Sequence, residues 1–361
     1  MNPQCPLHEH FEMRSVQRVF VFGAGASHGT RDQHPPMGKG LHRYVRQYLC
    51  KAREELTNLE NGDRAIVPDV RRTLKVLLDR ASSFESLVCD IRREKEKDPL
   101  LSKLNLLMAS ALTPPISSDP RVDDVFVEKV DTYDHLLAII HPKDGRLGET
   151  SFISFNYDCL LERAICRHLS KPLAGQGQCL CKHVDYHLSD HPSDDPEIVE
   201  VLKPHGSINW VADVTLGDGR IPPNAPVPIA GRYEPGDVFT WVNVNAVASP
   251  IGQGHEEIVL AHYAPGKEAQ ANPDTLLKIR RIACERIFRA KFITIIGLHL
   301  PTDPAEDPFL SDFLEAMRKA VGAGEAHVVF VNPDASESEK ARSHFGFDAS
   351  RKTFADYVSD L

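Results

Sequence analysis

Two polar residues that directly follow predicted strands could act together in proton transfer. Asn156 follows the apolar run at 151–155, and His205 lies just past the strand predicted at 198–202. A histidine titrates near neutral pH and can take a proton from a hydroxyl group or a water molecule, whereas an amide can orient that water without becoming charged. A strand-end histidine can instead be satisfied by backbone groups, and Asn156 can cap the helix expected from about residue 158. We predict that Asn156 and His205 are catalytic.

A glycine-rich segment follows the first predicted strand, at 18–22. Small residues at such a point let the backbone approach a diphosphate, and exposed N–H groups can hold its charge. The segment lacks the third glycine of the common dinucleotide fingerprint, because His28 stands there, and no Asp or Glu follows at a second strand end about 20 residues later. A tight turn without a ligand is the alternative. The segment consists of Gly23, Ala24, Gly25, Ala26 and Ser27.

The same residues also match the G-x-S-x-G nucleophile elbow, with Ser27 in the place of the nucleophile. An elbow serine normally follows several strands and enters a helix directly. Here it follows the first strand, and the stretch at 30–36 ends in two prolines that do not start a helix cleanly. We therefore favour a phosphate-binding turn over a serine nucleophile.

The segments that could carry chemistry all follow predicted strands. The sequence predicts these strands at 18–22, 151–155, 198–202, 292–297 and 327–332, with a further strand at 238–244. Ligands of open parallel sheets bind beyond the carboxyl ends of the strands. The segments that would meet there are Gly23 to Ser27, Asn156 to Asp158, His205 to Ser207, Gly297 to His299, and Asn332. We predict one ligand site at this edge, with the side chains of Asn156 and His205 exposed.

The rest of the pattern predicts the fold that positions these strand ends. Helices expected at 274–289 and 309–320 alternate with the last strands, which is typical of a parallel sheet with helices on both faces. We predict an α/β, Rossmann-like domain at 18–361 after a leader at 1–17. A large helical insertion at about 40–140 follows the first strand, and loop insertions lie at about 171–197 and 212–237.

The composition excludes several classes of protein. Of the 361 residues, 42% are hydrophobic and 26% charged, as in soluble globular proteins. The net charge of -9 argues against a broad nucleic-acid-binding face. No apolar run approaches the roughly 20 residues that span a bilayer, and the first residues lack a signal-peptide core. Eight scattered cysteines suit reduced thiols. We expect a cytoplasmic protein without membrane contact or strong direct nucleic-acid binding.

One cluster of cysteines and histidines could hold a metal. Cys179, Cys181 and His183 are followed by His187 and His191. A C-x-C spacing is unusual for structural zinc, and a polar loop collects histidines by chance. We predict a solvated insertion and no metal.

Taken in order, several motifs resemble those of the bacterial sirtuin-like NAD hydrolases over about residues 18 to 333. The motifs are F-G-A-G-A-S at 22–27, a loop with Pro36, S-F-E at 83–85, F-N-Y-D at 155–158, K-P-H-G-S-I-N-W at 203–210, G-L-H-L-P at 297–301 and V-N-P at 331–333. The blocks at 155–158 and 203–210 are the most distinctive.

The resemblance implies that NAD is the substrate, and it implies a role for each site residue. The glycine-rich segment would hold the diphosphate, and Asn156 would lie beside the nicotinamide ribose. Asp158 would fix the nicotinamide amide, His205 matches the catalytic histidine, and Asn332 would contact the adenosine ribose. The remaining NAD contacts would come from Gly206, Ser207, Gly297 and His299, where Leu298-His299 departs from the family's hydroxyl-bearing turn.

The expected reaction breaks the nicotinamide–ribose bond, which leaves an oxocarbenium-like ribose and a neutral leaving group. Water exclusion, placement of the nucleophile and polarisation of the ribose hydroxyls would assist it. A protein deacylase or an ADP-ribosyltransferase is the second possibility, although the chain has no C-x-x-C pair like those of deacetylase zinc ribbons. A non-catalytic sensor that binds NAD or ADP-ribose is the third.

The resemblance also implies a biological role, that of an antiphage effector that depletes NAD after activation. We expect a homo-oligomer, triggered by assembly or by a partner such as a hexameric DNA-translocase ATPase or another phage sensor. The helical insertion could cover the site or form the oligomer surface.

Overall fold

The structure is a computed structural model that describes most of the predicted domain. The described residues are 18–28, 38–51, 68–82, 84–93, 98–112, 132–141, 150–169, 183–188, 198–213, 238–240, 256–260, 273–301 and 307–361. The leader at 1–17, the prolines at 35 and 36, and most of the loop insertions at 171–197 and 212–237 lie outside them.

A seven-stranded sheet forms the centre of the molecule, in the order β10-β9-β8-β1-β2-β4-β3, and every neighbouring pair is parallel. The strands are β1 (Arg18–Phe22), β2 (Thr150–Ser154), β3 (Val184–Asp185), β4 (Val199–Leu202), β8 (Phe292–Ile296), β9 (His327–Val331) and β10 (Asp348–Ser350). The inner strands are nearly continuous apolar runs because the sheet is covered on both faces. The predicted α/β fold is confirmed.

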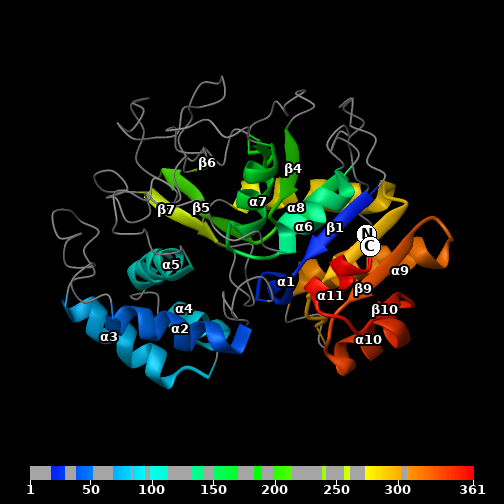
Figure 1. The fold of residues 1–361 in the computed structure, drawn as a ribbon. Coiled ribbons are helices and arrows are strands. Elements are labelled where there is room, and N and C mark those ends of the chain that lie inside the picture. Colours follow the sequence, from blue (N-terminus) through cyan, green and yellow to red (C-terminus); the bar gives the residue numbers. More distant parts are fainter. Residues whose placement is uncertain are drawn as a thin grey trace, which may run out of the picture.

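Two groups of helices cover the sheet (Figure 1). One group comprises α6 (Thr132–Ile140), α7 (Leu160–Leu169) and α11 (Phe354–Ser359), and the other α8 (Pro273–Arg289), α9 (Pro308–Gly322) and α10 (Ala335–Phe345). Their apolar faces and the strands share one core, in which Phe22, Phe152 and Phe330 are fully buried.

The residues after the first strand form a separate helical group, shown in shades of blue and teal below the sheet in Figure 1. It contains α2 (Gly38–Lys51), α3 (Pro68–Arg80), α4 (Phe84–Arg93) and α5 (Asp98–Leu112), which pack around a second apolar core. Helix α5 also contacts an antiparallel sheet, ordered β6-β5-β7, made of β5 (Gly206–Asp213), β6 (Val238–Thr240) and β7 (Glu256–Leu260). The second core includes Cys159 and Ile208, which flank the predicted site.

The structure departs from the sequence-based prediction at several elements. The glycine-rich segment is a one-turn helix, α1 (Ala24–His28), rather than a turn. Ser27 is the fourth residue of this helix, so it does not stand at the point where a strand turns into a helix, as a nucleophile-elbow serine does. The antiparallel sheet was missed because its pairing joins strands that are distant in sequence, with only one of them predicted. The elements after Asn332, namely α10, β10 and α11, were also missed.

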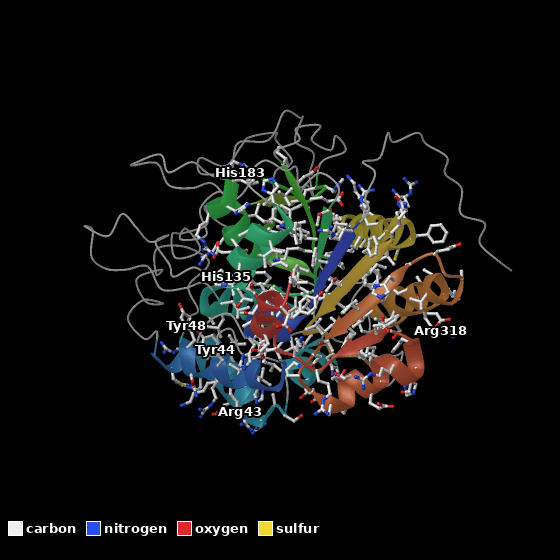
Figure 2. All side chains as sticks on the ribbon, turned by 45° about the vertical axis from the view of Figure 1, so that its right-hand side comes forward. Arg43, Tyr44, Tyr48, His135, His183 and Arg318 are labelled. Atoms are coloured by element: carbon white, nitrogen blue, oxygen red, sulfur yellow. The ribbon has the colours of Figure 1, made fainter. Side chains whose placement is uncertain are left out.

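Both helical regions of the described chain carry exposed charged side chains. Figure 2 shows Arg43 on α2 and Arg318 on α9 at distant parts of the molecule, both exposed.

None of the helices among the described residues has the length and apolar character that crossing a membrane requires.

Candidate active site

The carboxyl ends of the central strands lie level with one another at one edge of the sheet. Phe22 pairs in register with Ser154 on one side and Ile296 on the other, and Ile296 pairs with Val331. The residues that follow these strands therefore start from the same level. This brings together the segments that begin at Gly23, Phe155, Gly297 and Asn332.

Asn156 is bound to the end of β1 through its amide nitrogen. Nδ2 donates to the carbonyl oxygen of Gly23 at 3.0 Å and to the hydroxyl oxygen of Ser27 at 2.9 Å. An amide nitrogen has two protons, and both are used in this way. A substrate hydroxyl or water held by Asn156 must therefore donate to its Oδ1.

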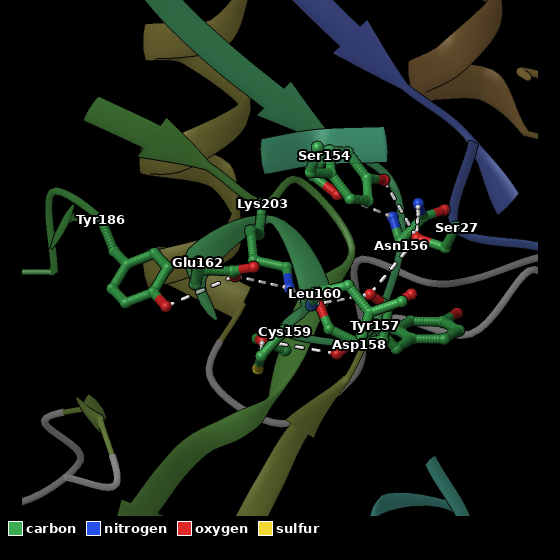
Figure 3. Close-up of polar contacts among 12 residues, drawn as sticks. Ser27, Ser154, Asn156, Tyr157, Asp158, Cys159, Leu160, Glu162, Tyr186 and Lys203 are labelled. Atoms are coloured by element: carbon green, nitrogen blue, oxygen red, sulfur yellow. Dashed lines mark hydrogen bonds and ion pairs between the residues drawn. The ribbon is translucent and has the colours of Figure 1, made fainter. Parts of the chain in front are cut away.

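Ser27 connects α1 to the segment after β2 and to helix α6. Its Oγ accepts from Asn156, donates to Oδ1 of Asp158 at 3.3 Å and lies 3.1 Å from the hydroxyl of Tyr133 on α6. Ser27 is fully buried, so its hydroxyl belongs to this network (Figure 3). Tyr133 was not among the predicted site residues, because nothing in the sequence separates it from other core residues of α6.

Asp158 stabilises the turn that follows β2. Its Oδ1 accepts from the backbone N–H of Leu160, the first residue of α7, at 3.0 Å. The helix-capping role that we weighed for Asn156 is therefore carried by Asp158. Asn156 is left to bridge β2 and β1.

A buried ion pair ties this turn to the end of β4. Lys203 donates from Nζ to Glu162 Oε1 at 2.9 Å and also to the backbone oxygen of Asp158 (Figure 3). Burial alone would lower the pKa of Lys203, but Glu162, Cys159 and Asp158 together raise it above its ordinary value, so Lys203 stays charged. Burial also raises the pKa of the Cys159 thiol to about 12. Cys159 is therefore a neutral packing residue.

His205 lies two residues beyond Lys203, and its ring is enclosed. The ring packs edge-on against Phe155, with 5.0 Å between centroids. Its Nε2 lies 3.1 Å from Oδ2 of Asp307, whose side chain is fully buried. Asp307 also caps α9, because its Oδ1 accepts from the N–H of Leu310 at 3.1 Å. The sequence carried a signal for this cap, an Asp before Pro308, that we did not use.

Gly206 and Ser207 shape the turn after His205. Gly206 has a φ of +79°, and its N–H donates to the carbonyl oxygen of Lys203 at 2.9 Å. The Ser207 hydroxyl donates to the backbone oxygen of Tyr157 at 3.4 Å. Gly206 thus closes the turn after β4, and Ser207 joins that turn to the segment that follows β2.

Three glycines interlock where β1 and β8 end. A Cβ on Gly23 would stand 2.6 Å from the carbonyl oxygen of Gly297, and one on Gly25 2.9 Å from the same atom. The N–H groups of Gly23, Gly25 and Ala26 donate to the carbonyl oxygens of Ile296, Gly297 and Gly23, respectively. These glycines are required by backbone packing, whatever ligand binds above them. Ala24 is the exposed residue of the segment.

His299 and Asn332 lie together on the β8–β9 side. Asn332 Nδ2 donates to the carbonyl oxygen of Leu298 at 3.0 Å, and His299 Nδ1 lies 3.0 Å from Oε1 of Glu337. Burial alone would raise the pKa of Glu337, but hydrogen bonds from His299, the Leu300 N–H and Lys340 lower it to about 2. Glu337 is therefore an anion behind the exposed His299 side chain.

One expectation about these residues is wrong. Asn156 is 5% exposed and His205 3% exposed, although we expected exposed strand ends. Their neighbours Phe155, Ser27 and Asp307 enclose them, which a reading of single strand ends does not reveal. Substitutions at either position therefore act on packing as well as on chemistry.

Part of the cysteine and histidine cluster can be placed. Cys179, Cys181 and His191 lie outside the described residues. His187 Nε2 lies 2.6 Å from Glu200, a buried carboxylate that also binds Arg286. No group of three or more potential ligands is placed to hold a metal ion among the residues that the structure describes.

No family model and no curated protein matches this sequence. Among solved structures, the chain is similar to a Sir2 homologue in complex with NAD, with 15% identity and a TM-score of 0.42 over 95% of this chain and 87% of that one. It is also similar to a serine-to-alanine variant of a Sir2 homologue with ADP-ribose, with 14% identity and a TM-score of 0.41 over 95% and 89%. A Sir2 complex with an inhibitor, 2′-O-acetyl-ADP-ribose and a deacetylated peptide has 11% identity and a TM-score of 0.38 over 95% and 91%.

Proposed function

We propose that this chain hydrolyses NAD at the bond between nicotinamide and ribose, giving ADP-ribose and nicotinamide. One observation carries the proposal. Asn156, fixed by the end of β1, and His205 follow neighbouring parallel strands at the edge where ligands of such sheets bind.

The chemistry needs a polarised water and a base. The bond between C1′ of the ribose and the nicotinamide nitrogen breaks, and its electron pair neutralises that nitrogen. A water oxygen forms the new bond to C1′, and its proton passes to His205. Asn156 orients the water or a ribose hydroxyl through Oδ1, because both protons of its Nδ2 already bind the protein.

The remaining predicted residues hold the rest of NAD in this proposal. The diphosphate lies over exposed Ala24, at the start of α1. Asp158 faces the nicotinamide amide, and Asn332 with exposed His299 receives the adenosine ribose. The close packing of Gly23 and Gly25 against Gly297, which brings the ends of β1 and β8 together, supports a single ligand site.

The test is to incubate the purified full chain with NAD, with and without an acyl-lysine peptide, and to separate the products. We expect free ADP-ribose and nicotinamide in equal amounts without peptide. If product forms only with peptide, the enzyme is a deacylase and not an NAD hydrolase. If the peptide also gains the mass of ADP-ribose, the enzyme is an ADP-ribosyltransferase. Saturable NAD binding without turnover under any assembly state would replace the proposal by a sensor.

We also propose that the enzyme depletes cytoplasmic NAD as an antiphage effector, and that it works as a homo-oligomer. A constitutively active NAD hydrolase would harm its host, so activity must depend on assembly or on a partner, such as a hexameric DNA-translocase ATPase or another phage sensor. Specific NAD cleavage should rise with protein concentration, in step with the mass measured by light scattering. A fully active monomer at nanomolar concentration would contradict this.

A further inference from the structure

The strongest observation that the proposed reaction does not use is the pairing of His205 with Asp307. Oδ2 of Asp307 lies 3.1 Å from Nε2 of His205, and the two side chains are 0% and 4% exposed, respectively. Asp307 comes from the segment between β8 and α9, so it reaches His205 from an element distant in sequence. A carboxylate enclosed to this degree needs polar partners, and the two described here are His205 and the N-terminus of α9.

We propose that Asp307 is a positioning residue for His205, and this inference rests on the proposed hydrolysis of NAD. Its carboxylate fixes the imidazole ring through Nε2 and stabilises the positive charge that the ring gains when it takes the proton of the attacking water. Phe155 packs edge-on against the same ring, so apolar contact and charge together set its orientation.

The surroundings support this assignment. Arg280 also lies beside this turn, where its Nε donates to the carbonyl oxygen of Pro204 at 3.1 Å and its guanidinium stands 5.3 Å from the centroid of Phe309. Arg280 thereby fixes the backbone just before His205. The Asp307 carboxylate also accepts a hydrogen bond from the N–H of Leu310 in α9. Helix α9 therefore fixes the position of Asp307 beside the His205 ring.

A capping role alone and a positioning role can be separated by substitution. Asn and Ser are both good N-caps and keep an oxygen for the Leu310 N–H, but both remove the negative charge. The variants Asp307→Asn and Asp307→Ser therefore keep the helix cap, so any fall in the temperature of thermal unfolding reports the lost pairing with His205 and not a lost cap. We expect each to lower kcat for NAD cleavage by roughly 100-fold with KM little changed.

A surface pair in the same protein provides the control. His327 Nε2 and Asp348 Oδ2 are 2.8 Å apart, but both side chains are exposed. Each is the first residue of its strand, whereas the candidate site lies beyond the last residues of the strands. Asp348→Asn removes a histidine–carboxylate pair of the same kind and should leave kcat unchanged.

A second readout separates failure of this inference from failure of the proposed function. Titration of the His205 imidazole by NMR in the full chain should show a lower pKa in Asp307→Asn than in wild type. If wild type cleaves NAD while Asp307→Asn keeps kcat within about threefold and titrates as wild type does, Asp307 is only a helix cap. If wild type never cleaves NAD but the His205 titration shifts, the pairing stands and hydrolysis is the part that is wrong.

Discussion

Gly297 and Ala26 lie so close that a Cβ on Gly297 would stand 2.2 Å from the amide nitrogen of Ala26. The same glycine has a φ of +63°, a conformation that L side chains rarely adopt. Two independent constraints therefore require glycine at this position.

Gly297→Ala should destabilise the protein by roughly 2–5 kcal/mol, the sum of the left-handed backbone strain and the overpacking against α1. The measurement is chemical denaturation of the full chain. Gly324→Ala is the matched control, because Gly324 has a φ of +71° but an added Cβ would meet nothing within 4 Å. Equal losses for the two variants would mean that the contact with Ala26 costs nothing.

Asn156→Ala and His205→Ala should each abolish NAD cleavage, because one removes the group that orients the nucleophile and the other removes its base. Ser27→Ala should lower activity far less, since Ser27 contributes only one of the two hydrogen bonds made by Asn156 Nδ2. Steady-state rates are compared after circular dichroism has confirmed folding. Loss of all activity in Ser27→Ala alone would instead favour a serine nucleophile.

Removing Lys203 should cost far more stability than removing an exposed cation. Lys203→Met leaves the carboxylate of Glu162 buried without its partner, which costs roughly 3–5 kcal/mol. The double variant Lys203→Met with Glu162→Leu should recover most of that loss. Arg318→Met breaks an exposed pair with Glu315 and serves as the control with little effect. If the double variant is no more stable than Lys203→Met, the cost does not come from the unpaired charge.

Glu337 should make stability depend on pH in the acid range. Its pKa falls from an ordinary 4.5 to about 2 in the folded chain. The stabilisation is therefore complete above about pH 4.5 and is lost as the pH falls towards 2. Urea midpoints of wild type and Glu337→Gln should differ at pH 7 and converge near pH 2. A constant difference across this range would show that the charge of Glu337 contributes nothing.

The sequence was sufficient for the five central strands β1, β2, β4, β8 and β9, because they are apolar runs bounded by glycine or polar residues and mostly alternate with helices. The two edge strands, β3 and β10, were not predicted. It also placed Asn156 and His205 at the same edge of the sheet, since the carboxyl ends of parallel strands meet there. That their strands β2 and β4 are neighbours is known only from the structure. Their burial could not be predicted, because it depends on Asp307 and Phe155 closing over them from segments whose approach is set by tertiary packing.

The antiparallel sheet shows the same limit. Gly206–Asp213 was interpreted as a motif rather than as a strand, because its two partners lie many residues further along the chain. The local sequence pattern does not indicate which distant strands will pair.

The second apolar core joins helices α2 to α5 with Cys159 and Ile208, and Tyr157 packs against it. The helical insertion and the loop that carries Asn156 thus have a common interior. Descendants of this protein could not shorten or exchange the helices as a detachable module, because the cut would leave the flanks of the site facing water. The helical insertion and the loop that carries Asn156 must therefore be inherited together, and a substitution in one requires a compensating substitution in the other.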